Sequence, residues 1–489
     1  MPDLSTTNRP PTTDYDAVVV GAGPNGLAAA IRLRQHGLSV LLLEAGATVG
    51  GGMRTAELTL PGFRHDIGSA VHPLGADSPF FKTLPLDQYG LRFIDPPIPA
   101  AHPFADGSAA CLLRSVDATA ETLGPDTGAY RQLMQPLLRH WPTLAADLLG
   151  PLRWPQNPLL FAQFGLKALL PATTLANRVF RTEHARGLWA GMAAHAIQPL
   201  SGLATSSVAL VLSLVGHARG WPMPAGGAQA IADALLGYYL AIGGQVQLRT
   251  TITSLRQLPS WRALLFDTTP RHLLQLGGHR WSWLYERQLR RFRYGMGVYK
   301  IDWALAEPVP FRHEAVQQAG TVHLGGSLET IAAAERETAR GGHPERPFVL
   351  LAQPSRFDAG RAPAGRHTLW AYCHVPNGSR RNMTDAIEGQ LERFAPGFRD
   401  RILARHTMDT AALEAYCPNY VGGDINSGAQ RIDQIFTRPA LRLSPYRTST
   451  RGIYLCSSAT PPGGGVHGMG GYWAANRALR DMFRMEPTR

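Results

Sequence analysis

The sequence predicts an α/β protein whose N-terminal part is a parallel βαβ unit, and three observations support this fold class. The chain has 489 residues, of which 44% are hydrophobic, enough to form two or more domain cores. Glycine (51) and proline (38) are abundant and charged residues make up only 17%, which is typical of a packed protein with many tight turns. Finally, a strand, a glycine-rich turn, a helix and a second strand follow one another near the N-terminus.

The glycine-rich turn has the spacing of a dinucleotide-binding motif. An apolar run over 16–20 is typical of a buried parallel strand, and Gly21-x-Gly23-x-x-Gly26 follows it directly. In such a motif Gly21 permits the tight turn, and Gly23 lets the backbone approach a pyrophosphate. Gly26 lets the helix lie close to the strand. We therefore predict a cofactor with a pyrophosphate group.

The rest of the unit stands in the expected order. A helix is predicted over 27–36, because Gly37 ends it, and a second strand over 38–43. Glu44 lies at the tip of this strand, where its carboxylate can accept hydrogen bonds from ribose hydroxyls. The ordered sequence of elements makes the motif far more specific than three glycines alone.

A second glycine cluster distinguishes FAD from NAD. The segment around Gly51 and Gly52 contains one arginine, Arg54, and resembles the double-glycine and arginine motif of FAD enzymes of the glutathione-reductase-like superfamily. In many of those enzymes the arginine directly follows the glycine pair, whereas Gly52 and Met53 intervene here. The resemblance implies FAD as the cofactor.

The C-terminal segment supplies a matching second half. A strand is predicted over 452–456 and a helix over 473–482, with a glycine-rich stretch between them. This stretch is similar to the closing motif of FAD-dependent desaturases and amine oxidases, in which a helix N-terminus stabilises negative charge on the reduced flavin. The resemblance implies cofactor contacts at four positions, namely Gly465, Val466, Gly468 and Met469.

The whole chain resembles phytoene-desaturase-like FAD-dependent oxidoreductases, in the branch that includes pyridine-nucleotide-disulfide-oxidoreductase-domain proteins. Pro224-Ala-Gly-Gly before a helical pattern, and a strand-like segment over 243–255, add to the match. The resemblance implies an adenine contact from the backbone near Ile252. It also implies a glutathione-reductase-like FAD-binding Rossmann domain with an interleaved α+β substrate domain. The expected FAD-domain segments are 14–100, 220–300 and 430–489, and the expected substrate-domain segments are 101–219 and 301–429.

Two residues are candidates for catalysis. Lys300 lies in a strand-like segment similar to the one in flavin amine oxidases whose lysine bonds through water to flavin N5; the alternative is a lysine that extends to the surface. His467 lies inside the glycine loop that the resemblance places at the flavin, and the alternative is a structural hydrogen bond. Eight aromatic residues are candidates for lining an apolar cavity, with Tyr420 and Tyr472 expected nearest the flavin: Trp189, Trp221, Trp370, Tyr372, Tyr416, Tyr420, Tyr472 and Trp473.

Cysteine and histidine spacing predict no metal site and no thiol–disulfide chemistry. The four cysteines lie at 111, 373, 417 and 456, so the first domain lacks the C-x(4)-C pair of disulfide reductases. No cluster has zinc-ligand spacing. The resemblance instead implies a desaturase-like dehydrogenase that transfers hydride from a C–H bond of an apolar, polyene- or isoprenoid-like substrate to flavin N5. Two alternatives stay open: an amine or amino-acid oxidase, and a non-enzymatic carrier of prenyl ligands on the same fold.

Charge and hydropathy suggest where the protein acts. The formal net charge is +12, but basic residues are distributed along the chain, so we expect no nucleic-acid partner. Residues 159–170 form an apolar stretch too short to span a bilayer, which could either contact a membrane peripherally or be buried. Residues 1–13 lack the features of a secretory signal. We expect a cytoplasmic protein with a small apolar substrate and an open oligomeric state.

Overall fold

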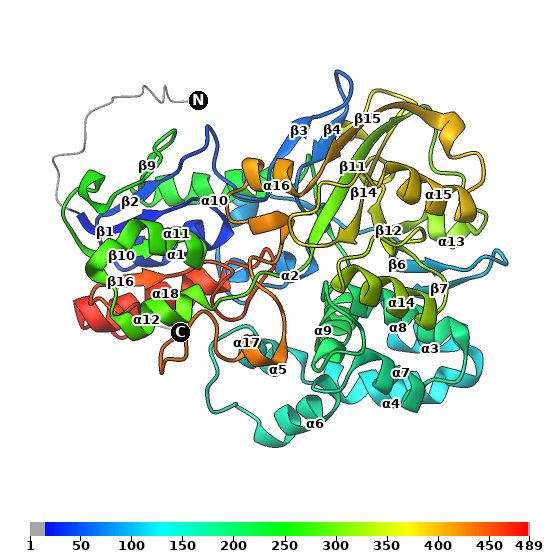
Figure 1. Cartoon of the computed structure of the whole chain (residues 1–489), viewed down its shortest axis with the longest axis horizontal. Helices are drawn as coiled ribbons and strands as arrows, with labels where there is room; N and C mark the ends of the chain where they lie inside the picture. The colour runs from blue at the N-terminus through cyan, green and yellow to red at the C-terminus, as the bar shows by residue number, and fades with distance from the viewer. Residues whose placement is uncertain (1–14, 488–489) are drawn as a thin grey trace.

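Two β-sheets organise the protein in the computed structural model, which describes residues 15–487 (Figure 1). The first sheet has five parallel strands in the order β16-β10-β1-β2-β9. The second has seven strands in the order β15-β11-β14-β13-β12-β6-β7, antiparallel except for the pair β12–β6. The prediction about residues 1–13 and the domain boundary at residue 14 lie outside the described residues.

The first sheet brings together segments from both ends and the middle of the chain. Its strands are β1 (Tyr15–Val20), β2 (Val40–Leu43), β9 (Gln245–Gln247), β10 (Trp261–Phe266) and β16 (Ile453–Leu455). The predicted strand over 243–255 is therefore wrong beyond residue 247. There the backbone leaves the sheet, because the N–H groups of Arg249 and Thr250 donate to the carbonyls of Gly46 and Glu44 (3.0 and 2.8 Å).

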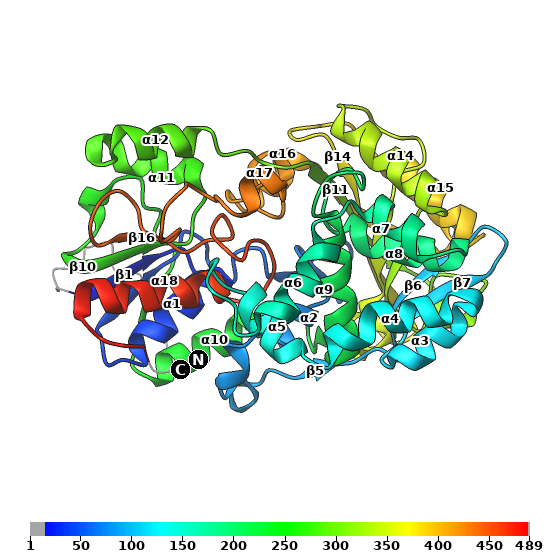
Figure 2. The same ribbon diagram turned by 90° about the horizontal axis from the view of Figure 1, so that it is seen from below.

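Helices cover both faces of this sheet. Ala17 and Val19 of β1 pack in the core that includes α1 and α18, whereas Val18 and Val20 pack in the core that includes α11 and α12. Both faces of the strand are thus apolar, as expected for a parallel sheet between two helical layers. Figure 2 shows α1 and α18 lying side by side. These helices are α1 (Pro24–Arg34), α18 (Met469–Ala478), α11 (Pro270–Gly277) and α12 (Trp283–Arg290).

Two helices begin earlier than the sequence patterns predicted. Helix α1 begins at Pro24, since proline is well suited to the first helical turn. Helix α18 begins at Met469, directly after Gly468 with a φ of +69°. Its Gly471 packs so closely on α1 that a Cβ would lie 1.8 Å from the Asn25 carbonyl oxygen. Close helix packing, which is not visible locally in the sequence, accounts for glycine inside this helix.

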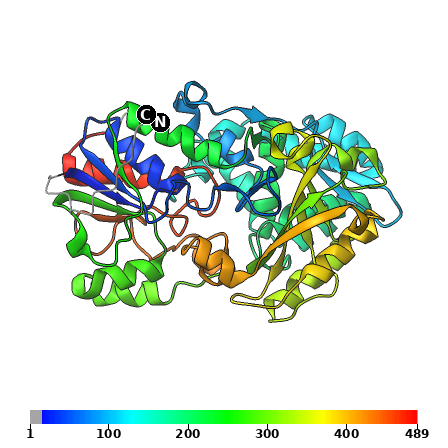
Figure 3. The same ribbon diagram turned by 90° about the horizontal axis from the view of Figure 1, so that it is seen from above.

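The second sheet separates a closed core from a cavity. Its strands are β6 (Ile98–Pro103), β7 (Ala109–Leu112), β11 (Gly297–Leu305), β12 (Ala319–Leu324), β13 (Val349–Ala352), β14 (His367–Val375) and β15 (Ile402–Met408). On β11, Ile301 and Trp303 belong to the core that includes α15 (Thr384–Phe394), whereas Val298 and Lys300 line a cavity on the opposite face. Figure 3 shows the two sheets at opposite ends of the molecule.

The mixed α/β fold is the one predicted, and the exact domain limits stay predictions. The remaining helices are α2 (Pro73–Ala76), α3 (Val116–Thr122), α4 (Thr127–Leu138), α5 (Trp141–Leu148), α6 (Pro158–Ala168), α7 (Ala172–Val179), α8 (Glu183–Ala194), α9 (Thr205–Ala218), α10 (Gln229–Ala241), α13 (Glu314–Gln317), α14 (Leu328–Ala339), α16 (Thr410–Tyr416) and α17 (Ile432–Ile435). Four short strands form two further pairs, namely β3 (Thr55–Glu57) with β4 (Arg64–Asp66) and β5 (Phe93–Ile94) with β8 (Met223–Pro224).

Within residues 15–487, every single helix falls short of the length and apolarity needed to cross a bilayer. Helices α6 and α7 meet those criteria only as a pair, and they are bent by 98° relative to each other.

Candidate functional site

The first glycine segment forms a crowded turn at the start of α1. Gly21 has a φ of +99°, which glycine adopts without strain. A Cβ on Gly26 would lie 1.9 Å from the Gly21 carbonyl oxygen, and a Cβ on Gly23 would lie 2.6 Å from Asp267 Oδ2. Gly23 and the following Asn25 line a cavity of about 270 Å³. The N-terminus of α1 therefore faces this cavity, where its N–H groups can bind an anion.

The second glycine cluster lies directly against the first. Gly51 and Gly52 line the same cavity, and a Cβ on Gly51 would lie 3.0 Å from the Gly23 Cα. A Cβ on Gly52 would lie 1.8 Å from the Tyr420 hydroxyl oxygen, so this position also requires glycine. The Tyr416 hydroxyl donates to the Gly51 carbonyl (3.2 Å), which fixes the loop from the other side.

Glu44 lies at the tip of β2, as predicted. Its carboxylate accepts hydrogen bonds from the N–H groups of Ala22 (2.8 Å) and Gly46 (2.8 Å). Arg54 Nη2 lies 3.3 Å from Glu44 Oε1 and donates to the Thr48 carbonyl (2.8 Å). The structure thus places Arg54 beside the acid at the strand tip and outside the lining of the cavity.

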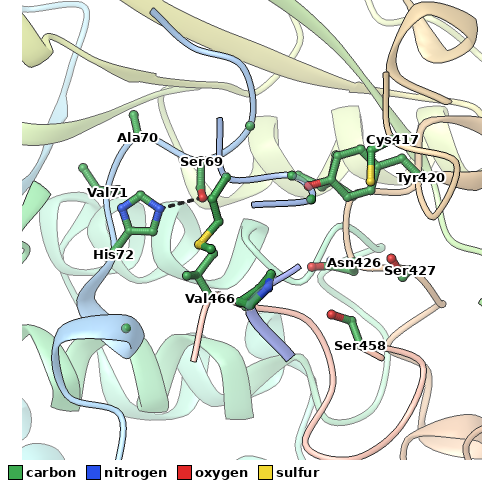
Figure 4. Close-up of a pocket in the computed structure, with 18 of the residues that line it drawn as sticks. Ser69, Ala70, Val71, His72, Cys417, Tyr420, Asn426, Ser427, Ser458 and Val466 are labelled. Atoms are coloured by element: carbon green, nitrogen blue, oxygen red, sulfur yellow. Dashed lines mark hydrogen bonds between the residues drawn. The ribbon is translucent and has the colours of Figure 1, made fainter. Parts of the chain in front are cut away.

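The glycine segment from the C-terminus meets the one from the N-terminus. Gly465, Val466 and Ser458 all line the cavity, and Figure 4 shows the last two. Asn25 Nδ2 donates to Ser458 Oγ (3.5 Å), and the Gly471 N–H donates to Asn25 Oδ1 (3.4 Å). These contacts join positions more than 400 residues apart. The two glycine segments therefore converge on one cavity.

Eight predicted site residues do not line the cavity themselves: Gly21, Gly26, Glu44, Arg54, Ile252, His467, Gly468 and Met469. His467 is buried behind the cavity wall and does not line the cavity. The Nδ1 atom of His467 accepts the Met469 N–H (3.1 Å), and its backbone carbonyl accepts the Ser78 hydroxyl (2.7 Å). Burial lowers the pKa of His467 to about 4. The structure gives His467 structural hydrogen bonds, and its catalytic role stays a prediction. Met469 and Ile252 also lie outside the lining. Gly468 caps α18, where a Cβ would lie 2.4 Å from the Phe81 ring.

Lys300, on β11, lines the cavity and forms a buried ion pair. Its side chain is buried, and its ammonium group forms an ion pair with Asp302 two residues further along the strand. Burial lowers the pKa of Lys300, opposed by the Asp302 charge. Burial alone would raise the pKa of Asp302, and the Lys300 charge instead holds it low. His65 Nδ1 lies 3.7 Å and His406 Nδ1 lies 3.9 Å from the Asp302 carboxylate. Lys300 is thus a buried charge in a cavity wall.

Aromatic and aliphatic side chains form the other end of the cavity. Four of the eight aromatic candidates line it, and the rings of Trp370 and Tyr372 meet edge to face at 5.3 Å. Tyr472 and Trp473 line a separate cavity on the outer side of α18, and Trp189 lies in the core. Tyr472, which was predicted near the flavin, therefore does not line the cavity that the glycine segments share. The lining aromatic residues are Trp221, Trp370, Tyr372 and Tyr420.

Two titratable residues of the cavity wall were missed by the sequence patterns. His195, at the end of α8, lines the cavity, and its Nε2 lies 2.9 Å from His323 Nε2. Burial lowers the pKa of His195 to about 3, so its ring is neutral. Asp267 follows β10 and reaches the start of α1. Its place was foreseeable, because the strand next to β1 ends at the same edge of a parallel sheet.

These residues fit a dinucleotide that carries a flavin. The start of α1 faces the cavity, and Glu44 lies at the strand tip that carries the ribose-binding acid in such units. The glycine segments approach one another so closely that a Cβ at Gly23, Gly26 or Gly52 would collide with a neighbouring oxygen. An apolar chamber adjoins them. No group of three or more metal-ligating side chains is found in residues 15–487.

Comparisons with known proteins agree with this geometry. The profile of the NAD(P)-binding Rossmann-like domain family matches residues 19–84. The mouse pyridine nucleotide-disulfide oxidoreductase domain-containing protein 2 is 27% identical over 96% of this chain and 94% of its own length. Hydroxyneurosporene desaturase from Cereibacter sphaeroides is 32% identical over 32% of this chain and 34% of its own length.

Solved structures share the fold over almost the whole chain. A putrescine oxidase bound to putrescine superposes with a TM-score of 0.62 and 19% identity, covering 97% of this chain and 100% of its own. An oxidoreductase from Methanosarcina mazei gives a TM-score of 0.65 and 15% identity, covering 95% of this chain and 99% of its own. The architecture is the FAD-binding fold of these enzymes. The N-terminal unit is thus a Rossmann-like dinucleotide-binding domain, and the whole chain shares the fold of these solved oxidoreductases.

Proposed function

We propose that this protein is an FAD-dependent dehydrogenase of the desaturase type that acts on an apolar organic substrate. The proposal rests on one observation: a single cavity joins both glycine segments to an apolar chamber. Its lining extends from Gly23 and Val466 to Leu350 and Trp370. A chamber of this character selects a substrate mainly by the burial of hydrocarbon.

The residues of the chain have separate tasks in this proposal. FAD, when bound, supplies the acceptor for the electrons and hydrogen that leave a C–H bond. The N-terminal amides of α1 hold its phosphates and Glu44 holds its ribose. The N-terminus of α18, which follows the cavity-lining Gly465 and Val466, contributes a positive dipole end beside the chamber. Trp370 and Tyr372 orient the substrate and exclude water.

A proton must leave the substrate if a double bond forms. His195 faces the cavity as a neutral imidazole that can accept a hydrogen bond from the substrate. Burial lowers its pKa to about 3, which makes it too weak a base to hold the proton near pH 7, so the proton passes on to water. His323 fixes its ring through the contact between their Nε2 atoms (2.9 Å), one nitrogen donating and the other accepting.

Oxidation of an amine is the second candidate. It is favoured by Lys300, because the resemblance to flavin amine oxidases predicted a lysine at this strand position and the structure places it in the cavity wall. The two candidates share the cofactor and the cavity, and they differ in the substrate that reduces the flavin.

Flavin content and anaerobic reduction test the proposal. Purified protein should be yellow, and it should bleach under argon with members of an isoprenoid series. Bleaching by amines alone would favour the second candidate. Colourless protein that cannot be reconstituted with FAD would contradict both and favour a ligand carrier. Gly26→Val, which places side-chain atoms against the Gly21 carbonyl, should abolish flavin retention, whereas Gly165→Ala in open space should not.

We also propose that the substrate enters from a lipid bilayer. Helix α6, at the lower edge of Figure 1, exposes leucines on its outer side: Leu159 is 78% and Leu166 is 77% exposed. Exposed apolar groups in such density are typical of an interaction surface. We call this surface the apolar face; its exposed members are Leu152, Trp154, Leu159, Leu166, Leu169 and Leu203.

Charge and connectivity support this entry route. Residues 148–182 contain no aspartate or glutamate but include Arg153, Lys167 and Arg178, which suits an anionic membrane surface. The end of α6 is joined to the start of α9, since the Ala204 N–H donates to the Leu169 carbonyl (2.9 Å). Further along α9, Leu212 lines the cavity.

Vesicle sedimentation tests the apolar face. The protein should bind phosphatidylcholine vesicles that contain phosphatidylglycerol more tightly than vesicles without it. Leu159→Glu together with Leu166→Glu should abolish binding, whereas Leu240→Glu, an exposed leucine on α10, should not. Equal binding by all three proteins would contradict the proposal.

A further inference from the structure

Asp267 binds the start of α1, where the FAD of the proposed function would bring its phosphates. Its Oδ2 accepts the Gly26 N–H (2.9 Å) at the start of α1, and the residue lines the cavity beside Gly23 and Asn25. Its backbone is fixed on both sides, because its N–H donates to the Val20 carbonyl (2.8 Å) and its carbonyl accepts Asn419 Nδ2 (3.0 Å). The carboxyl group therefore sits firmly on the helix N-terminus.

This position sets two anions in competition. The N–H groups at a helix N-terminus are the donors that a dinucleotide pyrophosphate uses. A carboxylate bound to the same donors blocks them, and in a buried site its charge repels a pyrophosphate dianion strongly. A protonated carboxyl carries no such charge.

The groups that face Asp267 do little to hold its charge. Burial raises its pKa to about 7, the Gly26 and Gly23 N–H groups oppose the rise, and the Glu44 carboxylate adds to it. Two thiols, Cys417 and Cys456, also interact with it electrostatically, but burial raises their own pKa values, so they stay neutral near pH 7. Gly26, Gly23 and Glu44 act on the pKa of Asp267, and none of them supplies a basic side chain that would keep the acid ionised.

We propose that Asp267 is a proton-linked stand-in for the cofactor pyrophosphate: above neutral pH its carboxylate binds the Gly26 N–H at the start of α1 in the free protein, and it must take up a proton when FAD binds. This inference rests on the FAD cofactor of the proposed function. The coupling makes loading with cofactor sensitive to pH in the neutral range, and it does so through a residue outside the glycine motif.

The linkage predicts the size of the effect. Below about pH 7 Asp267 already carries its proton in the free protein, so the affinity for FAD should be independent of pH. Above that pH each FAD bound must bring a proton with it, and the dissociation constant should rise about tenfold per pH unit. From about pH 7, where half of the free protein has lost this proton, to pH 8.5 the expected weakening is roughly fifteenfold.

Titration of the apoprotein with FAD, followed by flavin fluorescence between pH 6 and 8.5, tests this. Wild type should show the rise, whereas Asp267→Asn, which keeps the shape and the acceptor oxygen, should bind FAD with a nearly constant dissociation constant. Asp424→Asn is the matched control: Asp424 is also buried and accepts N–H groups, from Gly295 (2.7 Å) and Gly428 (2.8 Å), but it does not line the cavity. It should keep the wild-type rise.

Calorimetry of wild type needs no variant. In two buffers of different ionisation enthalpy at about pH 8, it should show the uptake of about one proton per FAD, and close to none at about pH 6. FAD binding with a flat pH profile and no proton uptake would overturn the role of Asp267 and leave the proposed function intact. Absence of FAD binding at every pH would overturn both. A pH profile retained in Asp267→Asn would overturn the inference alone.

Discussion

Replacing Lys300 should destabilise the fold as well as alter the reaction. Lys300→Met removes the positive partner of Asp302, whose side chain is 0% exposed. Removing one partner of a buried ion pair costs about 3–5 kcal/mol, because the other charge stays buried without compensation. A protein of this kind has a total stability of about 5–15 kcal/mol, so the loss is large.

The environment of Asp302 gives the effect a pH dependence. His65 Nδ1 lies 3.7 Å from Asp302, and its pKa is lowered to about 4 by burial and partly by the Lys300 charge. In Lys300→Met, either Asp302 keeps a proton or His65 gains one. The folded variant then binds more protons than its unfolded chain as the pH rises, so its free energy of unfolding falls toward high pH. The destabilisation should be larger at about pH 8 than at about pH 5.5.

Urea unfolding of the apoprotein at the two pH values measures this free energy. Lys82→Met is the control, because Lys82 also pairs with an aspartate, Asp77, but its side chain is 52% exposed, and such pairs contribute about 0–1 kcal/mol. Lys300→Met combined with Asp302→Leu should recover most of the loss, since no buried charge remains. A loss below about 1 kcal/mol at about pH 8 for Lys300→Met would refute the reasoning.

Three further predictions follow from the site. Gly23→Ala should lose FAD, because its Cβ would lie 2.6 Å from Asp267 Oδ2, whereas flavin content should be unchanged in Gly165→Ala, where nothing lies within 4 Å. The free energy of unfolding of the apoprotein should fall by up to about 4 kcal/mol as the pH rises from about 4 to 7, because the folded pKa of Asp267 (about 7) lies above its ordinary value of 3.8. Urea titrations of Asp267→Asn should lack this fall in stability. His467→Ala should lower the melting temperature, because it removes the acceptor of the Met469 N–H at a cost of about 1–3 kcal/mol, while the rate of anaerobic flavin reduction should not change. A much slower reduction with unchanged stability would instead support a catalytic role for His467.

Sequence patterns were reliable where the functional residues lie close together in the sequence. The strand, Gly21-x-Gly23-x-x-Gly26 and the acid Glu44 fall within one short segment, and the backbone geometry of a βαβ unit imposes their spacing. Lys300 was found because it stands in a recognisable strand. The sequence placed His467 in the right loop, but it did not show that the side chain lies outside the lining of the cavity, because a loop motif does not fix side-chain direction.

The contacts between distant segments explain the rest. Asp267 and His195 carry no motif of their own, and only the pairing of β10 with β1 and the packing of α8 on the second sheet bring them to the cavity. The sequence by itself determined the fold class, because short-range spacing and periodicity specify a βαβ unit, and the resemblance of its glycine segments to those of FAD enzymes indicated the cofactor. The tertiary structure alone decided which polar groups face the cavity, because burial and the register between strands depend on residues hundreds of positions apart.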